Sequence, residues 1–166
     1  MAQQYFVLGI GGTGMRCIES LIHLCAMGMF DDTDIHLLAL DTDKDNGNFA
    51  RLKEVKEAYV KAKGTDASLR AALNETFFSA NINYYEFSPN YEVKSDFMSV
   101  FNYGDTKFNN PEQTAIADLV LTKNVETFNL RHGYRAQTHL GSMMMYHSIL
   151  EAARSNKNSE LKTYLQ

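Results

Sequence analysis

Apolar and polar residues alternate in blocks along the N-terminal part of the chain, and these blocks predict one supersecondary unit. Residues 5–8 form a short aromatic and β-branched run that ends at a glycine, which predicts a buried strand. Apolar side chains then recur at helical spacing and predict a helix over about 13–29: Ile18, Leu21, Ile22, Cys25 and Met29. Residues 35–40 form a second apolar run and predict a second strand. Strand, glycine turn, helix and strand make a βαβ unit with parallel strands and a right-handed connection.

The remainder of the chain carries weaker signals. Asn48 is a suitable N-cap for a helix over 49–63, and residues 82–87 alternate in the manner of a strand. Further helices are predicted after Asp66, over 93–103, from Pro111, from Ser142 through Arg154, and from about Ser159. We therefore expect a three-layer, Rossmann-like α/β domain with a central parallel sheet. The predicted strands are few for such a fold, which favours a fragment of a longer protein.

Composition narrows the class of protein without identifying it. The chain has 166 residues, 45% of them hydrophobic and 22% charged, which fits one globular domain and excludes disorder of the whole chain. The net charge of −4 disfavours a non-specific nucleic-acid binder. No apolar run approaches the roughly 20 residues that span a bilayer, so we expect no membrane partner. Cys17 and Cys25 share one predicted helix, about 12 Å apart along its axis, and cannot form a disulfide, which fits a reducing cytoplasm.

The glycine turn between the first strand and helix carries the strongest chemical signal. Gly9-x-Gly11-x-x-Gly14 matches the dinucleotide-binding fingerprint and has the flanking strand and helix that the fingerprint requires. Glycines let the backbone approach a phosphate closely, the helix behind them presents unpaired N–H groups, and Thr13 adds a hydroxyl. The alternative is a turn whose glycines serve only close packing of the strand on the helix.

Asp41 follows the second strand, at the carboxyl edge where open α/β sheets bind their ligands. Here an acid could hold ribose hydroxyls, and Asp41 with Asp43 could reach Mg²⁺ through water. The alternative is a pair of surface turn residues. Later in the chain, Arg135 and the start of the helix predicted at Ser142 could hold a terminal phosphate, unless this is merely a solvated basic loop. The sequence contains no Walker motif, zinc-ligand spacing or nucleophile elbow.

Three stretches resemble a known superfamily. Residues 7–16 read Val-Leu-Gly-Ile-Gly-Gly-Thr-Gly-Met-Arg, and residues 38–43 read Leu-Ala-Leu-Asp-Thr-Asp. Together with 130–142, they resemble the tubulin/FtsZ superfamily, and most of all its divergent bacterial tubulin-like proteins. In that superfamily the glycine loop wraps the nucleotide phosphates, the loop after the second strand lies near the sugar and magnesium, and the next loop approaches the terminal phosphate. The resemblance covers about 5–45 and 130–154, so that 49–129 would be a mostly helical insertion in a domain that includes 1–166.

The resemblance implies a cytoplasmic protein that binds a purine nucleotide, GTP (or ATP), with Mg²⁺ and self-associates or joins a larger complex. GTP hydrolysis would need missing C-terminal segments and a neighbouring subunit, and no catalytic residue is assigned within the chain. The residues implied to bind the nucleotide, with Asp43 also the metal candidate, are Gly9, Gly11, Gly12, Thr13, Gly14, Arg16, Asp41, Thr42, Asp43, Gly133, Arg135 and Ser142.

Two departures from the superfamily pattern bear on these expectations. Its diagnostic Gly-Gly-Gly-Thr-Gly-Ser/Thr-Gly loop and its downstream acidic loop are absent from these residues. Arg16 stands where FtsZ proteins usually carry asparagine, which leaves the base and phosphate contacts open.

Three other functions remain open. Ubiquitin-activating-type adenylating enzymes share a Gly-x-Gly-Gly-x-Gly turn, an Asp-x-Asp turn and an Asn-x-x-Arg motif, which Asn48 and Arg51 resemble, with a spacing from Asp43 that is one residue short. An NAD-dependent oxidoreductase would use Asp41 for the ribose, although no catalytic donor is apparent. A partner-binding domain with a degenerate pocket would have no catalytic function at all.

Overall fold

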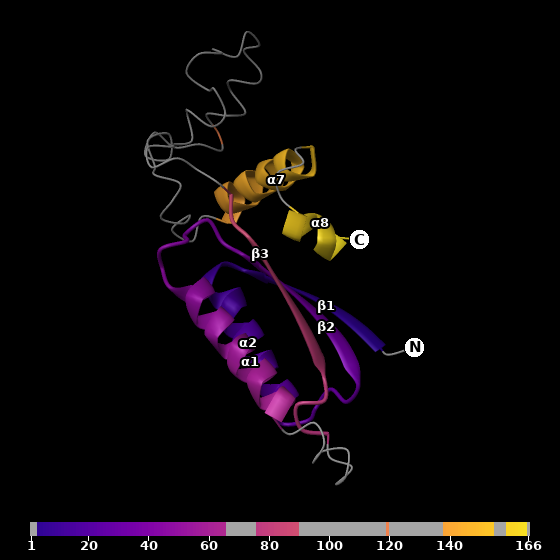
Figure 1. Cartoon of the computed structure of the whole chain (residues 1–166). Helices are drawn as coiled ribbons and strands as arrows, with labels where there is room; N and C mark the ends of the chain where they lie inside the picture. Colours follow the sequence, from indigo (N-terminus) through magenta and orange to yellow (C-terminus); the bar gives the residue numbers. More distant parts are fainter. Residues whose placement is uncertain (1–2, 66–75, 90–118, 120–137, 155–158, 166) are drawn as a thin grey trace. The chain divides into compact units, whose positions relative to one another are not determined.

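The computed structural model describes residues 3–65, 76–89, 119, 138–154 and 159–165 (Figure 1). The helices predicted after Asp66, over 93–103 and from Pro111 lie outside the described residues. The chain divides into two compact units, one of Met1–Ser88 with Ala152–Gln166, and one of Pro89–Glu151. Each unit is described by itself.

A small parallel sheet forms the centre of the first unit. It consists of β1 (Gln3–Ile10), β2 (Thr33–Leu40) and β3 (Asn81–Phe87), in the order β1-β2-β3. Both pairings are parallel, with Ile35 of β2 opposite Tyr5 of β1 and Ile82 of β3. The predicted parallel βαβ unit and the strand predicted over 82–87 are therefore confirmed. β1 and β2 start earlier than the apolar runs that predicted them, because their first residues are polar and pair all the same.

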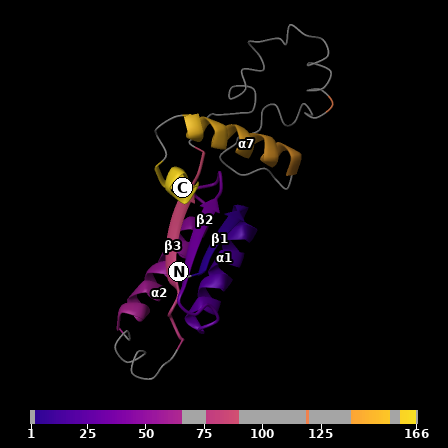
Figure 2. The ribbon, with the colours of Figure 1, turned by 90° about the vertical axis from the view of Figure 1, so that its right-hand side faces the viewer.

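Two helices cover one face of this sheet. α1 (Gly11–Ala26) buries Met15, Ile18, Ile22 and Cys25 against the sheet, and α2 (Asn48–Thr65) buries Phe49, Leu52 and Tyr59 in the same core. Figure 2, in which the strands face the viewer, shows both helices behind the sheet, α1 on the side of β1 and α2 on the side of β3. Ile18, Ile22 and Cys25 of the predicted stripe are thus on the buried face, whereas Met29 lies beyond the helix and is exposed, so the predicted end of the helix near Met29 is wrong.

α1 ends where the backbone turns into a left-handed conformation at Gly28, whose φ is +84°. The N–H of Met27 donates to the carbonyl of His23, and that of Gly28 donates to the carbonyl of Cys25. Cys17 is exposed and Cys25 buried, and both are free thiols, as the sequence predicted. Burial raises the pKa of Cys25 to about 11.

The opposite face of the sheet carries aromatic side chains and a short helix, α8 (Ser159–Leu165), close to the predicted position. Tyr164 of α8 makes edge contacts with Phe6 and Tyr85, each with ring centroids 5.8 Å apart. The carboxylate of Glu160 accepts the backbone N–H of Glu86 at 2.8 Å, which caps part of the outer edge of β3. Helices therefore lie on both faces of the parallel sheet.

The second unit contains most of α7 (Thr138–Arg154). Residues four apart are buried along this helix: Leu140, Met144, Ser148 and Ala152. The helix begins at Thr138, so the predicted start at Ser142 is wrong; the sequence 138–141 reads as a loop because of Gly141, yet it continues the helix. Among the described helices, none is long and apolar enough to cross a membrane.

Candidate functional site

The glycine turn joins β1 directly to α1, with Ile10 as the last strand residue and Gly11 as the first helical one. Gly11 has a φ of +66°, the left-handed conformation that favours glycine. Ile10 is the N-cap of α1, and no side chain caps the helix through a hydrogen bond. The first N–H groups of a helix have no partner within it and carry its positive dipole end. The turn therefore presents uncapped donors beside a glycine backbone.

Gly9 and Gly14 hold the strand against the helix. A Cβ on Gly14 would lie 2.7 Å from the carbonyl carbon of Gly9, and a Cβ on Gly9 would lie 2.5 Å from Cδ1 of Ile18 and 2.9 Å from the carbonyl oxygen of Gly14. Neither contact is compatible with an unmoved backbone. The packing alternative raised by the sequence therefore explains these two glycines.

Packing does not explain Gly11 and Gly12. A Cβ on Gly11 would meet nothing within 4 Å, and a Cβ on Gly12 would meet only the side-chain amide of Asn48, at 2.9 Å from Nδ2. The positive φ falls on Gly11 and not on Gly12. Space above these two backbone positions is thus open, apart from one flexible side chain at the start of α2.

The loop between β2 and α2 has the opposite character, because its polar groups bond to one another. Asp41 is buried, at 7% exposure. Its Oδ1 accepts the N–H of Asp43 at 3.2 Å, and its Oδ2 accepts the side-chain amide of Asn46 at 3.1 Å. Both carboxylate oxygens thus have partners inside the loop. These two bonds are those of a turn residue, but Asp41 is buried and not on the surface, and a ligand role for it stays a prediction.

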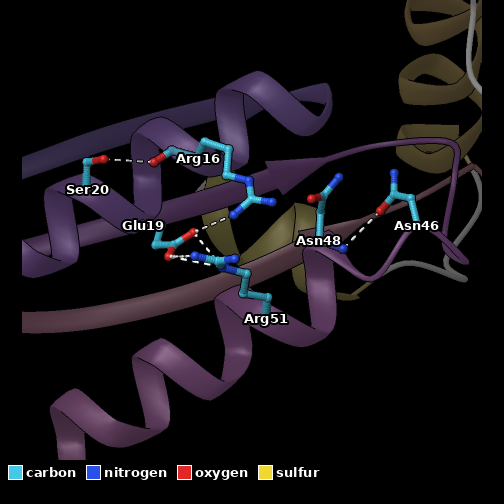
Figure 3. A network of polar contacts seen from close by, with 6 residues as sticks. All are labelled: Arg16, Glu19, Ser20, Asn46, Asn48 and Arg51. Atoms are coloured by element: carbon cyan, nitrogen blue, oxygen red, sulfur yellow. Dashed lines mark hydrogen bonds and ion pairs between the residues drawn. The ribbon is translucent and has the colours of Figure 1, made fainter.

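Two more side chains repeat this bonding pattern along the loop. Oδ1 of Asp43 accepts the N–H of Asp45 at 3.0 Å, and Oδ1 of Asn46 accepts the N–H of Asn48 at 3.0 Å (Figure 3). Such two-residue contacts are the Asx turns by which Asp and Asn organise loops. In the part of the chain that the structure describes, no three His, Cys, Asp or Glu side chains form a metal-holding group. Asp43 would hold Mg²⁺ only together with oxygens of a ligand or with water.

Two hydroxyls at the carboxyl edge of the sheet are buried and have no hydrogen-bond partner among the residues that the structure describes. They are Oγ1 of Thr42, which follows β2, and Oγ of Ser88, which follows β3. The two strand ends lie side by side, since the N–H of Asp41 donates to the carbonyl of Phe87 at 3.3 Å. Buried hydroxyls normally have a hydrogen-bond partner, so this edge of the sheet is unusual in having two hydroxyls without one in the described part of the chain. Thr42 was a candidate site residue in the sequence analysis, but Ser88 was not, because it belongs to none of the motifs.

A charged cluster ties α1 to α2 next to the glycine turn. Nε and Nη2 of Arg51 donate to the carboxylate of Glu19 at 2.7–3.1 Å, and Nη1 of Arg16 donates to the same carboxylate at 3.4 Å (Figure 3). Arg51 is the main cause that lowers the pKa of Glu19, and Glu19 in turn raises the pKa of Arg51. Sequence reasoning missed Glu19, because its partner Arg51 comes from a different helix.

The late loop contributes less than the sequence suggested. Gly133 and Arg135 lie outside the described residues. Ser142 is exposed and lies inside α7, beyond the first turn, where the backbone N–H has an intrahelical partner. We predicted that a helix starts at Ser142 and that its first N–H groups hold a phosphate. This prediction is therefore wrong.

No family model, curated protein or solved structure matches the chain.

Proposed function

We propose that the chain binds a purine nucleoside triphosphate through its glycine turn, as the nucleotide-binding part of a tubulin-like protein. The observation that carries this proposal is that the four glycines of the turn have two different roles. Gly9 and Gly14 are needed for packing, whereas Gly11 and Gly12 leave open space beside the uncapped start of α1. Backbone N–H groups at a helix start next to Cβ-free positions are what a phosphate chain requires.

The acidic loop favours a triphosphate over a dinucleotide. An NAD site would use a carboxylate at the end of β2 to accept hydrogen bonds from ribose hydroxyls. Here a ribose hydroxyl would compete with the N–H of Asp43 and the amide of Asn46 for the oxygens of Asp41. Asp43 is less buried than Asp41 and keeps one carboxylate oxygen for which no hydrogen bond is seen, so it suits a Mg²⁺ ion held mainly by phosphates. We propose guanine as the base, and hence GTP as the nucleotide, from the superfamily resemblance alone.

A second candidate, an adenylating site for ATP, is favoured by one observation. The side chain of Asn48 lies beside Gly12, where the asparagine of an Asn-x-x-Arg motif would face the glycine turn. Arg51, the arginine of that motif, bonds Glu19 through both Nε and Nη2, so that a carboxylate already neutralises its charge. This second function is therefore the weaker of the two.

The test is a calorimetric titration of the full chain with GTP, GDP, ATP and NAD in the presence of Mg²⁺. We expect GTP to bind most tightly, and Gly12→Val to remove the binding, because its methyl groups would press on Asn48 and fill the space above the turn. The matched control is Gly64→Val, which puts the same side chain into open space on α2. Circular dichroism should show both variants folded.

Three results would count against the proposal. Tightest binding of NAD would support the oxidoreductase, strong preference for ATP would support the adenylating enzyme, and GTP affinity unaltered in Gly12→Val would make the turn a packing device. We also expect the isolated chain to hydrolyse GTP far more slowly than about 1 per second, because no water-activating acid is assigned and positioning supplies most of the catalysis of phosphoryl transfer.

A further inference from the structure

One face of α1 carries Gly12, Arg16 and Glu19, at positions i, i+4 and i+7, and this face is turned toward the start of α2. Figure 3 shows the side chains of Arg16 and Glu19 extending from α1 toward Arg51 and Asn48 of α2. Arg16 lies about 6 Å along the helix axis from Gly12. Helical side chains lean toward the N-terminus, so the guanidinium of Arg16 is within reach of the turn.

The two arginines of this face are held very differently. Arg51 makes three bonds to Glu19, the shortest 2.7 Å, and so occupies both carboxylate oxygens. Arg16 adds one bond of 3.4 Å, which is at the long limit for a hydrogen bond, while the side chains of both arginines are equally exposed, at 54%. The charge of Glu54 also acts on Arg51, so Arg16, the arginine nearer to the glycine turn, is the more weakly paired of the two.

We propose that Arg16 is a specificity-determining residue of the glycine turn, and that it binds the oxygens of a ligand's outer phosphates. This inference rests on the proposed function, since it names the part of the ligand that the site selects: a chain of two or three phosphates rather than a monophosphate. Arg51 has a positioning role. By occupying Glu19 it prevents that carboxylate from neutralising Arg16.

The chemistry of the guanidinium suits this role. Its planar fork of N–H donors matches phosphate oxygens, and bonds between two charged groups are roughly twice as strong as neutral ones. A monophosphate held at the first turn of α1 would not extend to Arg16, whereas a longer phosphate chain would. Removal of Arg16 should therefore weaken binding of polyphosphates selectively.

The experiment measures affinity by calorimetry and stability by thermal unfolding on the full chain. The probes are Mg·GTP, GMP and inorganic tripolyphosphate, which lacks base and sugar. For Arg16→Ala we expect about tenfold weaker binding of GTP and tripolyphosphate, the equivalent of one charge-assisted bond, with little change for GMP or for the melting temperature. Arg16→Lys should recover part of the loss. The matched control is Lys53→Ala, which removes one positive charge from an exposed position of α2.

Variants of the other two residues test the positioning role. Arg51→Ala should lower polyphosphate affinity as well, because Glu19 then becomes free to hold Arg16. Adding Glu19→Gln to Arg51→Ala should restore that affinity, although the melting temperature stays low. A purely structural role of Arg51 would give no such recovery.

The outcomes separate the inference from the proposed function. If the wild-type chain binds neither GTP nor tripolyphosphate, both are wrong. If wild type binds GTP but Arg16→Ala binds it equally well, or loses GMP and GTP affinity in the same proportion, the assignment of Arg16 is wrong and the proposed function stands. If Lys53→Ala loses as much affinity as Arg16→Ala, the effect is one of general charge, which also overturns the assignment.

Discussion

The glycine turn and the acidic loop lie next to each other, at the ends of two neighbouring strands, yet they use their polar groups in opposite ways. In the loop, Asp41, Asp43 and Asn46 each accept a hydrogen bond from inside the loop. At the turn, no side chain caps α1, and a Cβ on Gly11 would meet nothing within 4 Å. The carboxylates and Asn46 of the loop are bonded within it, although the hydroxyl of Thr42 is not, whereas the turn offers its donors outward. In sequence, both are simply dense in residues typical of nucleotide sites.

This contrast shows where ligand chemistry can be assigned. A carboxylate that already has two partners contributes mainly to the shape of its loop, because a ligand would have to replace both bonds. Uncapped N–H groups have nothing to replace except water. Under the proposed function, the acidic loop supports the site and the turn binds the phosphate.

The largest effect is expected where the glycine turn is closed by packing. Gly14→Ala places a Cβ 2.7 Å from the backbone of Gly9, so the strand and helix must move apart. We expect a loss of about 3 kcal/mol in the free energy of unfolding, measured with urea, because overpacking is costly and alanine's better helix propensity recovers at most about 1 kcal/mol. Gly64→Ala, in open space on α2, is the control and should be neutral or stabilising. Equal stability of the two variants would refute the packing role.

The next largest effect is expected in the acidic loop, whose carboxylates are hydrogen-bonded within the loop. Asp41→Ala would leave the N–H of Asp43 and the amide of Asn46 without their acceptor at part-buried bonds. We expect a loss of about 2 kcal/mol in unfolding free energy. Asp43→Ala removes one more exposed bond and should lose less. A wild-type stability of Asp41→Ala would show that the loop does not depend on this carboxylate.

A smaller effect separates the two open glycines from each other. Gly11→Ala forces an L side chain into the left-handed conformation and should lower stability by about 1 kcal/mol, even though nothing obstructs the side chain. Gly12→Ala only displaces the flexible amide of Asn48 and should be less destabilising. Chemical denaturation of both variants gives the order, and the reverse order would contradict the backbone geometry described here.

The smallest effect is the pH dependence of the tie between α1 and α2. The hydrogen bond from Arg51 lowers the pKa of Glu19 below its ordinary value of 4.5. A carboxyl whose pKa is lowered by folding stabilises the fold above its unfolded pKa, and this stabilisation is lost as the pH falls through the folded value. The wild type should therefore melt slightly above Glu19→Gln at pH 7, and the difference should vanish near pH 3. Because the pair is exposed, added salt should also reduce this difference in melting temperature. A difference that grows toward low pH would contradict the role of the ionised Glu19.

The sequence predicted the elements whose apolar periodicity is strong. β1, α1 and β2 follow from such patterns, and their parallel pairing follows from the βαβ rule. The boundaries were less predictable, since the helix α1 starts at Gly11, inside the glycine motif, and α7 includes Gly141. Glycine signals a turn in sequence, yet both helices include a glycine.

The location of the candidate site was predictable from the sequence, but the roles of its individual residues were not. All four glycines of the turn are plain in the sequence, but only the three-dimensional distances separate Gly9 and Gly14 from Gly11 and Gly12. Likewise, Glu19 and Arg51 are 32 positions apart, and no local pattern announces their contact. Hydrogen-bond partners of Asp41 depend on how the loop folds back, which the residue types alone leave open.

The most direct test of the central claim is an amide NMR titration of the full chain with Mg·GTP. The amide signals of Gly11, Gly12 and Thr13, at the uncapped start of α1, should shift most. Those of Asp43 and Asp45, whose N–H groups are already bonded within the acidic loop, should shift less, and only through the Mg²⁺ ion that Asp43 is proposed to approach. Shifts concentrated in the acidic loop with the glycine turn unmoved, or no shifts in either region, would contradict the assignment of the phosphate to the glycine turn.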